Sequence, residues 1–426
     1  MTAAPRAPAG APAISVVVPS YNRRHTLEMV LGGLAAQRGV PPDAFEVLVV
    51  LDGSTDGSDA MLAAWQRGGR LPRLRWESRA NGGQAAARDA GARAAAAPLL
   101  LFLDDDVVPE PDLVARHLAG HPPGARVAVL GDCEIVREAA HPFYTQQMWS
   151  WWEDLYTARA RPGRAPCYVD FCAGNVSLRR EDYLVSGGFD PAFRGYGGED
   201  YDLGYRLLRA GVRFVADRRA HAMHHHRFTS YATFFRTRRQ EGSADVLLGR
   251  KHPELRAGIR AATPEPDDPD ERRILHAAFA PVELSARVRR ANAAWLALDE
   301  RLRRRVRWKR RLDRMGAYYY WRGVYDVLGS LDALDAFRRE ATLPVQHVDV
   351  RGGLGAAPDG FWVHGPSEIA VTAGGRPLGT VRLPGPVMRP LREALADVIG
   401  HGLVVPILLE AERAGTSLFT PGPSRV

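Results

Sequence analysis

The first hundred residues alternate between short apolar runs and helical patterns, and this alternation restricts the fold more than any other feature of the chain. ISVVVPS, FEVLVVL and PLLLFL are continuous apolar runs, with a weaker run, LRWES, between the last two. Helical patterns over residues 27–37, 58–66 and 83–95 separate them. Strands that are buried on both faces give continuous runs of this kind, and intervening helices favour a parallel sheet. We therefore expect an α/β fold in which helices flank a mostly parallel sheet.

Polar residues directly follow three of the predicted strands, at residues 20–22, 52–56 and 104–106. Ligands of open parallel sheets gather at the carboxyl ends of the strands. We therefore expect these three segments to form one site at that edge of the sheet.

The chain changes character twice after the predicted sheet. An arginine-rich helical stretch is interrupted at ATPEPDDPDE, which has the composition of a linker or loop. Further on, EIAVTAGG and RPLGTVRLP read as a hairpin. The predicted parts are a disordered tail at 1–12, an α/β domain at 13–245, a helical arginine-rich segment at 246–340 and a small accessory α+β module at 341–426.

The charge balance is basic, with 57 Lys and Arg against 49 Asp and Glu and a formal net charge of +8. Such a charge attracts anionic partners, although an arginine-rich codon bias explains part of it. Three cysteines without a CxxC pair predict a reducing, cytoplasmic location. The first residues lack the apolar region of a signal peptide, and no run approaches the ~18 apolar residues of a membrane span. We expect any membrane contact to be peripheral.

Three aspartates, Asp104, Asp105 and Asp106, directly follow the run LLLFL. Adjacent carboxylates repel one another unless a cation lies between them. Mn²⁺ or Mg²⁺ prefers oxygen ligands and readily bridges carboxylates to phosphates. A solvated acidic loop or a helix N-terminus is the alternative interpretation, but the buried strand that leads into the triplet favours a metal site.

Three further patterns add candidates. In GYGGED, Asp200 begins a helical segment, either as a general base or as a helix cap. The histidines of HAMHHHR are either metal ligands or exposed residues at a strand end. The glycines of Asn81-Gly82-Gly83 precede a helix that bears Arg88. Backbone N–H groups at such a helix start can bind a phosphate, and so can the forked donors of arginine.

Together and in this order, these segments resemble the family 2 glycosyltransferases with a GT-A fold, over residues 14–242. The resemblance rests on VVVPSYNR, LDGSTDG, NGGQAAARDAG, FLDDDV, CAGNVSLRR, GGFD and GYGGEDYDLGYRL. It implies the inverting transfer of a sugar from a nucleotide-diphosphate donor, commonly UDP-linked, to a glycan or lipid-linked acceptor in cell-surface glycan synthesis. The chain has Leu51-Asp52 where family members often carry two acidic residues. The QxxRW motif of processive synthases is not apparent, which favours transfer of a single sugar.

The resemblance also implies roles for individual residues. Asp200 corresponds to the base that deprotonates the acceptor hydroxyl, and Glu199 to a residue that orients this base or binds the acceptor. The expected ligands of Mn²⁺ or Mg²⁺ are Asp104, Asp106, His224 and, as second choice among the histidines, His226. The residues expected to bind the donor are Pro19, Tyr21, Asn22, Asp52, Asn81, Gly82, Arg88, Asp104 and Asp105. The residues expected on the acceptor side are Gly174, Asn175, Gly197 and Gly198.

The stretch RLRRRVRWKRRLDRMGAYYYWRGVY, at residues 301–325, supports an alternative function. Basic residues interleaved with aromatic ones fit nucleic-acid binding through backbone contacts and base stacking. They also fit an interfacial helix on an anionic membrane, with Trp308 and residues 318–321 at the headgroups. An arginine-rich helix that packs through its aromatic face explains the same pattern. Lipid-linked acceptors, implied by the resemblance, favour a membrane over nucleic acid.

Overall fold

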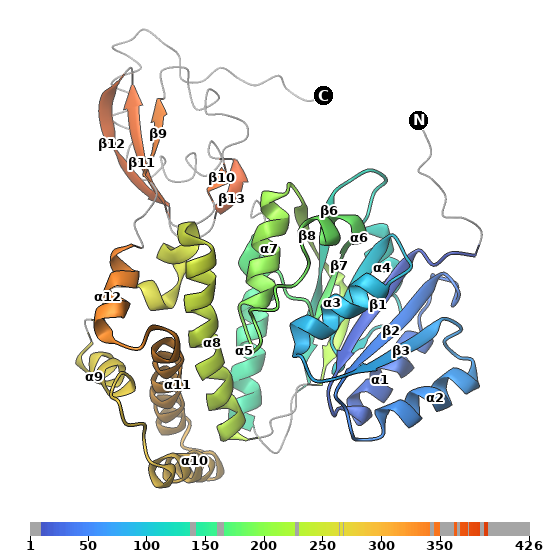
Figure 1. Ribbon diagram of the computed structural model, residues 1–426, viewed down its shortest axis with the longest axis horizontal. Coiled ribbons are helices and arrows are strands. Elements are labelled where there is room, and N and C mark those ends of the chain that lie inside the picture. Colours follow the sequence, from blue (N-terminus) through green and yellow to red (C-terminus); the bar gives the residue numbers. More distant parts are fainter. Residues whose placement is uncertain are drawn as a thin grey trace. The chain divides into compact units, whose positions relative to one another are not determined.

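The structure is a computed structural model, and its sheet and helices form two compact units (Figure 1). It describes residues 10–136, 142–159, 166–225, 230–263, 265–266, 268–340, 345–349, 362–363, 367–373, 375–383 and 387–390. The first unit comprises residues 1–244 and 273–326, and the second comprises residues 245–272 and 327–426. Residues 273–326 are thus grouped with the sheet-bearing unit, and not with the other residues of the helical segment expected from the sequence. The functional limits of the domains stay a prediction.

An eight-stranded sheet, in the order β3-β2-β1-β4-β7-β6-β8-β5, forms the centre of the first unit. The strands are β1 (Ile14–Ser20), β2 (Phe45–Asp52), β3 (Leu74–Arg79), β4 (Leu99–Leu103), β5 (Val107–Pro109), β6 (Val127–Ile135), β7 (Asn175–Arg179) and β8 (Arg213–His224). β1 pairs in parallel with β2 and β4, β2 with β3, and β6 with β8. β7 runs antiparallel to β4 and β6, and β5 runs antiparallel to β8. The expected mostly parallel α/β fold is confirmed.

Helices cover both faces of this sheet. The helices of the chain are α1 (Arg24–Ala35), α2 (Ser58–Gly68), α3 (Gln84–Ala94), α4 (Leu113–Ala119), α5 (Pro142–Arg159), α6 (Arg180–Val185), α7 (Glu199–Arg209), α8 (Tyr231–Lys251), α9 (Pro269–Ala278), α10 (Ala286–Arg301), α11 (Arg305–Leu328) and α12 (Leu331–Arg339), with 3₁₀ turns η1 (Tyr168–Asp170), η2 (Pro253–Gly258) and η3 (Arg260–Ala262). Val16 and Val18 of β1 belong to the core formed with α1, α2, α4 and α5. Val17 belongs to the opposite core, with α3, α6 and α7. This division follows from the alternation of side chains along a strand.

Helix α11 buries the aromatic residues of the arginine-rich stretch. Trp308, Tyr318, Tyr319, Tyr320 and Trp321 are all buried. Trp308 Nε1 donates a hydrogen bond of 2.8 Å to Tyr231 Oη, and the ring of Tyr319 stacks on Phe235 with 5.1 Å between centroids. Of the three interpretations of this stretch, an arginine-rich helix that packs through its aromatic face is confirmed, so these buried aromatic residues are not available to headgroups or nucleic-acid bases.

The second unit contains short strands. They are β9 (Val345–Asp349), β10 (Trp362–Val363), β11 (Ser367–Ala373), β12 (Arg376–Leu383) and β13 (Val387–Pro390). β11 and β12 form an antiparallel hairpin, which confirms the hairpin expected from the sequence. Its turn includes Gly375, whose φ of +81° suits glycine. β9 pairs in parallel with β11, and β10 pairs antiparallel with β13; the helix expected near residues 389–399 lies almost wholly outside the described residues. Among the described helices, none is long and apolar enough to cross a membrane.

Candidate active site

The aspartate triplet follows β4 at the carboxyl edge of the sheet, and its charge is balanced by arginine. Arg23 forms ion pairs with Asp106 and, at 3.5 Å, with Asp105. Burial raises the pKa of Asp105 to about 7, against the opposing effect of Arg23. Asp105 and Asp106 are therefore buried carboxylates, whereas the side chain of Asp104 is 22% exposed.

The structure brings His224 to the same carboxylates. β8 ends at His224, which pairs with Val107 of β5, and its Nε2 lies 3.4 Å from Asp106 Oδ1. Burial lowers the pKa of His224, but the charges of Asp106 and Asp104 outweigh burial and leave that pKa raised. Two of the predicted metal ligands thus lie side by side.

The donor set of Asp104, Asp106 and His224 suits Mn²⁺ or Mg²⁺ in its chemistry, because it combines carboxylate oxygens with one imidazole nitrogen. Asp104 instead accepts hydrogen bonds from Gln84 Nε2 at 3.0 Å and Arg88 Nη2 at 2.6 Å. In the part of the chain that the structure describes, no three His, Cys, Asp or Glu residues are grouped closely enough to hold a metal ion. His226 lies outside the described residues. Metal binding therefore stays a prediction.

Arg88 links the aspartate triplet to the GYGGED segment. Its side chain is 2% exposed, and besides Asp104 it lies 3.7 Å from Glu199 Oε1 and 3.8 Å from Asp200 Oδ1. Buried arginine is tolerated when carboxylates compensate its charge. The sequence predicted that Arg88 binds phosphate, but the structure places it between three carboxylates.

Asp200 lies in the first turn of α7, and its carboxylate accepts a hydrogen bond of 3.1 Å from the backbone N–H of Ala173. The N-cap of α7 is Gly198, so the alternative interpretation of Asp200 as a helix cap is wrong. Burial raises the pKa values of Asp200 and of Glu199, the latter to about 7, whereas Arg88 lowers both. Such a carboxyl group exchanges a proton more readily near neutral pH than an ordinary one does.

The turn that begins α7 depends on glycine. Gly197 and Gly198 have φ values of +94° and +86°, which side chains rarely adopt. A Cβ at Gly198 would also lie 2.8 Å from the ring of Phe193 and 3.0 Å from Ala244 Cβ. The two glycines therefore fix where Asp200 enters the site, and direct contact with an acceptor stays a prediction.

The segment expected to bind the donor phosphate is organised by Asp52. Its carboxylate accepts hydrogen bonds from the backbone N–H groups of Gly82 at 2.9 Å and Gly83 at 2.8 Å, while Asn81 Nδ2 donates to its carbonyl oxygen at 2.9 Å. The expectation that these N–H groups are free for a phosphate is therefore corrected, because Asp52 already accepts from both.

The remaining donor-side residues lie at the end of β1. Pro19 is buried and Tyr21 is 52% exposed. Asn22 has a φ of +52°, and its Oδ1 accepts a hydrogen bond of 2.7 Å from the N–H of Thr55. Tyr21 thus offers a large exposed aromatic surface to a ligand.

On the predicted acceptor side, Gly174 and Asn175 differ. The carbonyl oxygen of Gly174 accepts from the N–H of Asp104 at 3.2 Å. Asn175 is buried, donates to the carbonyls of Asp132 and Ala220, and has its Oδ1 2.8 Å from His117 Nε2. The expectation that the Asn175 side chain contacts an acceptor is therefore corrected. Its hydrogen bonds instead hold β6, β7 and β8 together.

Sequence reasoning missed three residues of the site: Arg23, Gln84 and Trp152. Arg23 directly follows Tyr21-Asn22, and Gln84 directly follows the two glycines, so proximity to the predicted segments was a usable signal. Trp152 of α5 packs edge-on against His224, with 5.8 Å between ring centroids. No motif in the sequence links these two rings.

Comparison with known proteins identifies the family. Residues 15–184 match glycosyl transferase family 2. This region is a family 2 glycosyltransferase domain. Residues 154–231, which include the GYGGED segment, match a second family, described as the N-terminal domain of galactosyltransferase.

Curated relatives match about half of the chain. Validoxylamine A glucosyltransferase of Streptomyces hygroscopicus subsp. limoneus is 36% identical over 240 residues, which cover 50% of this chain and 52% of the relative. An uncharacterized glycosyltransferase of Bacillus subtilis (strain 168), YfnE, is 26% identical and covers 47% of this chain and 61% of its own length. The mannosyltransferase PcManGT from Pyrobaculum calidifontis, solved with GDP-Man and Mn²⁺, is 20% identical with a TM-score of 0.45, covering 72% of this chain and 87% of that chain. The chain thus spans about half the length of the validoxylamine A enzyme.

Proposed function

We propose that the protein is an inverting glycosyltransferase that moves a single sugar from a nucleotide-diphosphate donor to an acceptor hydroxyl and depends on Mn²⁺ or Mg²⁺. The observation that carries this proposal is the position of Arg88. One buried guanidinium contacts Asp104 at 2.6 Å and lies within 4 Å of both Glu199 and Asp200. The carboxylates expected to face the donor diphosphate and the carboxylate expected to activate the acceptor therefore belong to one cluster.

Asp200 is the proposed base. Its side chain is 20% exposed, against 8% for Glu199, so it is the more accessible of the two to an acceptor hydroxyl. The backbone of Ala173 and the charge of Arg88 hold it in place. With a single base and no covalent intermediate, the acceptor oxygen attacks from the side opposite the leaving diphosphate, and the anomeric configuration inverts.

Asp104, Asp106 and His224 are the residues that would hold the metal ion. When bound, the ion neutralises negative charge on the leaving diphosphate. Arg23 supplies a second positive group beside Asp105 and Asp106. We infer that Tyr21 and Asp52 line the nucleotide, and UDP is the expected nucleotide. The relatives named as glucosyltransferases support a glucosyl donor.

This proposal is tested by measuring the binding of a panel of nucleotide sugars in the presence of Mn²⁺, Mg²⁺ or EDTA. We expect metal-dependent binding of one donor, and loss of that binding in Asp106→Ala. Glu181→Gln is the matched control, because Glu181 is an exposed carboxylate on α6. The absence of metal-dependent binding to every donor would overturn the proposal.

A specific observation also supports peripheral contact with an anionic membrane, but at a different surface from the buried aromatic residues of α11. Trp295, Leu298, Leu302 and Val306 are exposed along α10 and the start of α11. The exposed arginines around them are Arg287, Arg290, Arg301, Arg303, Arg304, Arg305 and Arg307. Exposed apolar side chains flanked by arginine suit an anionic lipid surface. We expect the protein to sediment with anionic vesicles but not with neutral ones, and Trp295→Ala to sediment less with the anionic vesicles. A protein that sediments with neither kind of vesicle would contradict this proposal.

A further inference from the structure

A short stretch of backbone contacts both halves of the proposed catalytic cluster. The backbone N–H of Ala173 donates a hydrogen bond of 3.1 Å to the carboxylate of Asp200. The carbonyl oxygen of the next residue, Gly174, accepts one of 3.2 Å from the N–H of Asp104. Gly174 also lies close to the Asp104 side chain, because a Cβ at this glycine would be 3.1 Å from Asp104 Oδ2. The position of this stretch therefore affects the proposed base and the donor-side aspartate together.

Arg159, the last residue of α5, holds the chain just before this stretch. Its Nη2 donates a hydrogen bond to the backbone carbonyl oxygen of Asp170, and its Nε lies 3.8 Å from Asp170 Oδ1. Both side chains are buried, with exposed fractions of 3% and 1%. Asp170 Oδ2 accepts a hydrogen bond of 2.7 Å from the backbone N–H of Cys167. Arg159 thus fixes the turn η1, which leads into Ala173.

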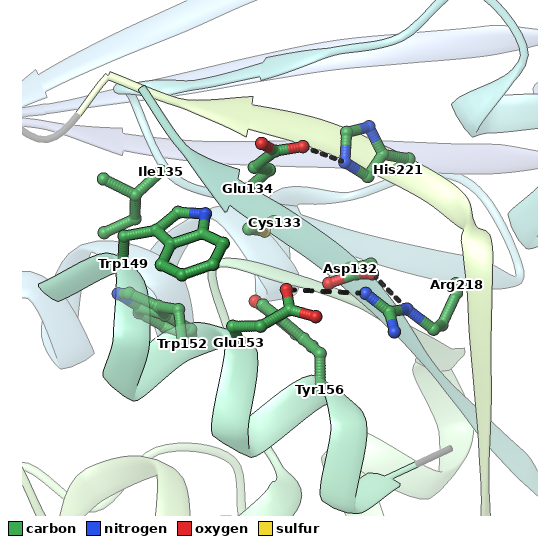
Figure 2. A pocket seen from close by; sticks show the side chains of 10 residues that line it. All are labelled: Asp132, Cys133, Glu134, Ile135, Trp149, Trp152, Glu153, Tyr156, Arg218 and His221. Atoms are coloured by element: carbon green, nitrogen blue, oxygen red, sulfur yellow. Dashed lines mark hydrogen bonds and ion pairs between the residues drawn. The ribbon is translucent and has the colours of Figure 1, made fainter. Parts of the chain in front are cut away.

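Helix α5 is a firm support for Arg159. Figure 2 shows Trp152 and Tyr156 on this helix, facing strand β6. The two rings are buried and stack on each other, with 5.6 Å between centroids. The Arg159 guanidinium lies over the ring of Tyr156, 4.9 Å from its centroid, and gains a cation–π contact there. A side chain whose neighbours are packed in this way keeps a defined position.

The same stretch packs tightly against α7, the helix that begins with Glu199 and Asp200. A Cβ at Gly204 of α7 would lie 2.8 Å from Phe171 Cβ and 3.1 Å from the carbonyl oxygen of Tyr168. The absence of a side chain at this glycine allows the two backbones to approach so closely. A shift of the stretch would therefore disturb the packing of the helix that carries Asp200.

Charged and titratable groups act on Asp200 from several elements. They are Arg88 of α3, Glu199 of α7, Asp104 after β4, Arg159 of α5 and Cys172 before β7. Burial raises the pKa of Asp200, and the charge of Asp104 raises it further. Arg88, the Ala173 N–H and Arg159 lower it. Burial and the charge of Asp200 raise the pKa of the Cys172 thiol to about 12, so this thiol is neutral at neutral pH. Arg159 is thus a second cation, on a separate helix from Arg88, that favours the ionised form of Asp200.

We propose that Arg159 is a positioning residue for the base. It holds the turn η1 so that the Ala173 N–H stays on Asp200, and its charge favours the carboxylate form that takes the proton of the acceptor. Its side chain is buried against Asp170 and Tyr156, so it acts through Asp200 and not on the substrate. The inference rests on the proposed function, because it adds a residue to the site at which the acceptor hydroxyl is deprotonated.

The test variant is Arg159→Met/Asp170→Asn in the full-length protein. It removes both members of the buried pair, so no uncompensated charge is left behind. The new amide oxygen can still accept from the N–H of Cys167. We expect kcat for sugar transfer to fall by about tenfold to a hundredfold, the loss that a small displacement of a reacting group causes. Binding of the nucleotide sugar should stay close to that of the wild type, because Asp104 keeps its side-chain partners.

Arg126→Met/Asp182→Asn is the matched control. Arg126 also pairs with a buried aspartate, at 2.7 Å from Asp182 Oδ1, and also donates to a backbone carbonyl, that of Ala210 at 2.6 Å. These partners lie outside the carboxylate cluster. The kcat of this control should therefore match that of the wild type.

The pH dependence separates positioning of the base from a purely structural role. Asp170→Asn alone is the reference, because its comparison with the double variant isolates the loss of the Arg159 charge. Since that charge favours ionised Asp200, its loss should move the acid limb of kcat/KM to higher pH. The Asp200 carboxyl group, titrated by ¹³C NMR without donor and assigned by its loss in Asp200→Asn, should titrate at higher pH in the double variant as well.

A fall in kcat no larger than that of the control would overturn the proposal, and so would an Asp200 titration that is the same in the double variant and in Asp170→Asn. If the wild type transfers sugar, either result leaves the proposed function standing. Absence of transfer from every donor in the wild type contradicts the proposed function. A shifted titration of Asp200 would even then support the action of Arg159 on this carboxylate, because the titration requires no donor.

Discussion

Two polar regions at the carboxyl edge of the sheet solve the problem of buried charge in different ways. Around Asp52, the carboxylate accepts hydrogen bonds from two backbone N–H groups, and the turn is complete without a ligand. Around Arg88, three carboxylates share one buried guanidinium, and the pKa values of Glu199 and Asp200 are raised. The difference shows that similar polar sequence motifs can have different structural results. The Asp52 carboxylate completes a loop, whereas the carboxylates around Arg88 keep raised pKa values, as the proposed base requires.

Removal of Arg88 should separate the two regions most clearly. In Arg88→Met, a buried cation is lost while its carboxylates remain, and we expect the free energy of unfolding to fall by about 3–5 kcal/mol. Arg93→Met is the matched control on the same helix, because Arg93 is exposed and pairs with Asp89 at 2.7 Å. Chemical denaturation should show a change below about 1 kcal/mol for the control. Equal effects of the two substitutions would contradict the central position given to Arg88.

Asp52→Asn should have a smaller effect on stability, and that effect should be concentrated in the loop. The amide cannot accept from both Gly82 and Gly83, since one of its two polar atoms is a donor. We expect the free energy of unfolding to fall by about 1.5–3 kcal/mol, because a hydrogen bond to a charged group contributes about that much. Hydrogen exchange of the two glycine amides is the direct measurement, and unchanged protection would show that Asp52 does not organise this turn.

The smallest expected effect is a shift in the pH at which kcat/KM falls on the acid side. The base accepts a proton only when it is ionised, and burial raises the pKa of Asp200 above its ordinary value. Activity should therefore be lost, as pH falls, at a higher pH than for an exposed aspartate with a pKa of about 3.9. Because Arg88 lowers this pKa, Arg88→Gln should move the acid limb to still higher pH. An activity that stays constant down to about pH 4 would exclude a buried carboxylate as the base.

The sheet was predictable because its strands are buried on both faces, and such strands appear in the sequence as continuous apolar runs like FEVLVVL. The order of the motifs suggested that Asp104 and Asp200 lie close together. No local pattern could show this, because 96 positions separate the two residues and Arg88, from a third segment, lies between them. Asn175 was misplaced because a motif does not reveal which polar side chains are consumed by internal hydrogen bonds. The contact of Trp152 with His224 depends on how α5 packs on the sheet, which no local pattern determines.

The most direct test of the proposed function compares donor binding with sugar transfer in Asp200→Asn. The amide has nearly the shape of the carboxylate but cannot take the proton of the acceptor hydroxyl. We predict that binding of the nucleotide sugar stays within a small factor of the wild type, while kcat for transfer falls at least about a hundredfold, the loss expected for a missing general base. Transfer at the wild-type rate by Asp200→Asn would contradict the assignment of Asp200 as the base and of the Arg88 cluster as the catalytic site.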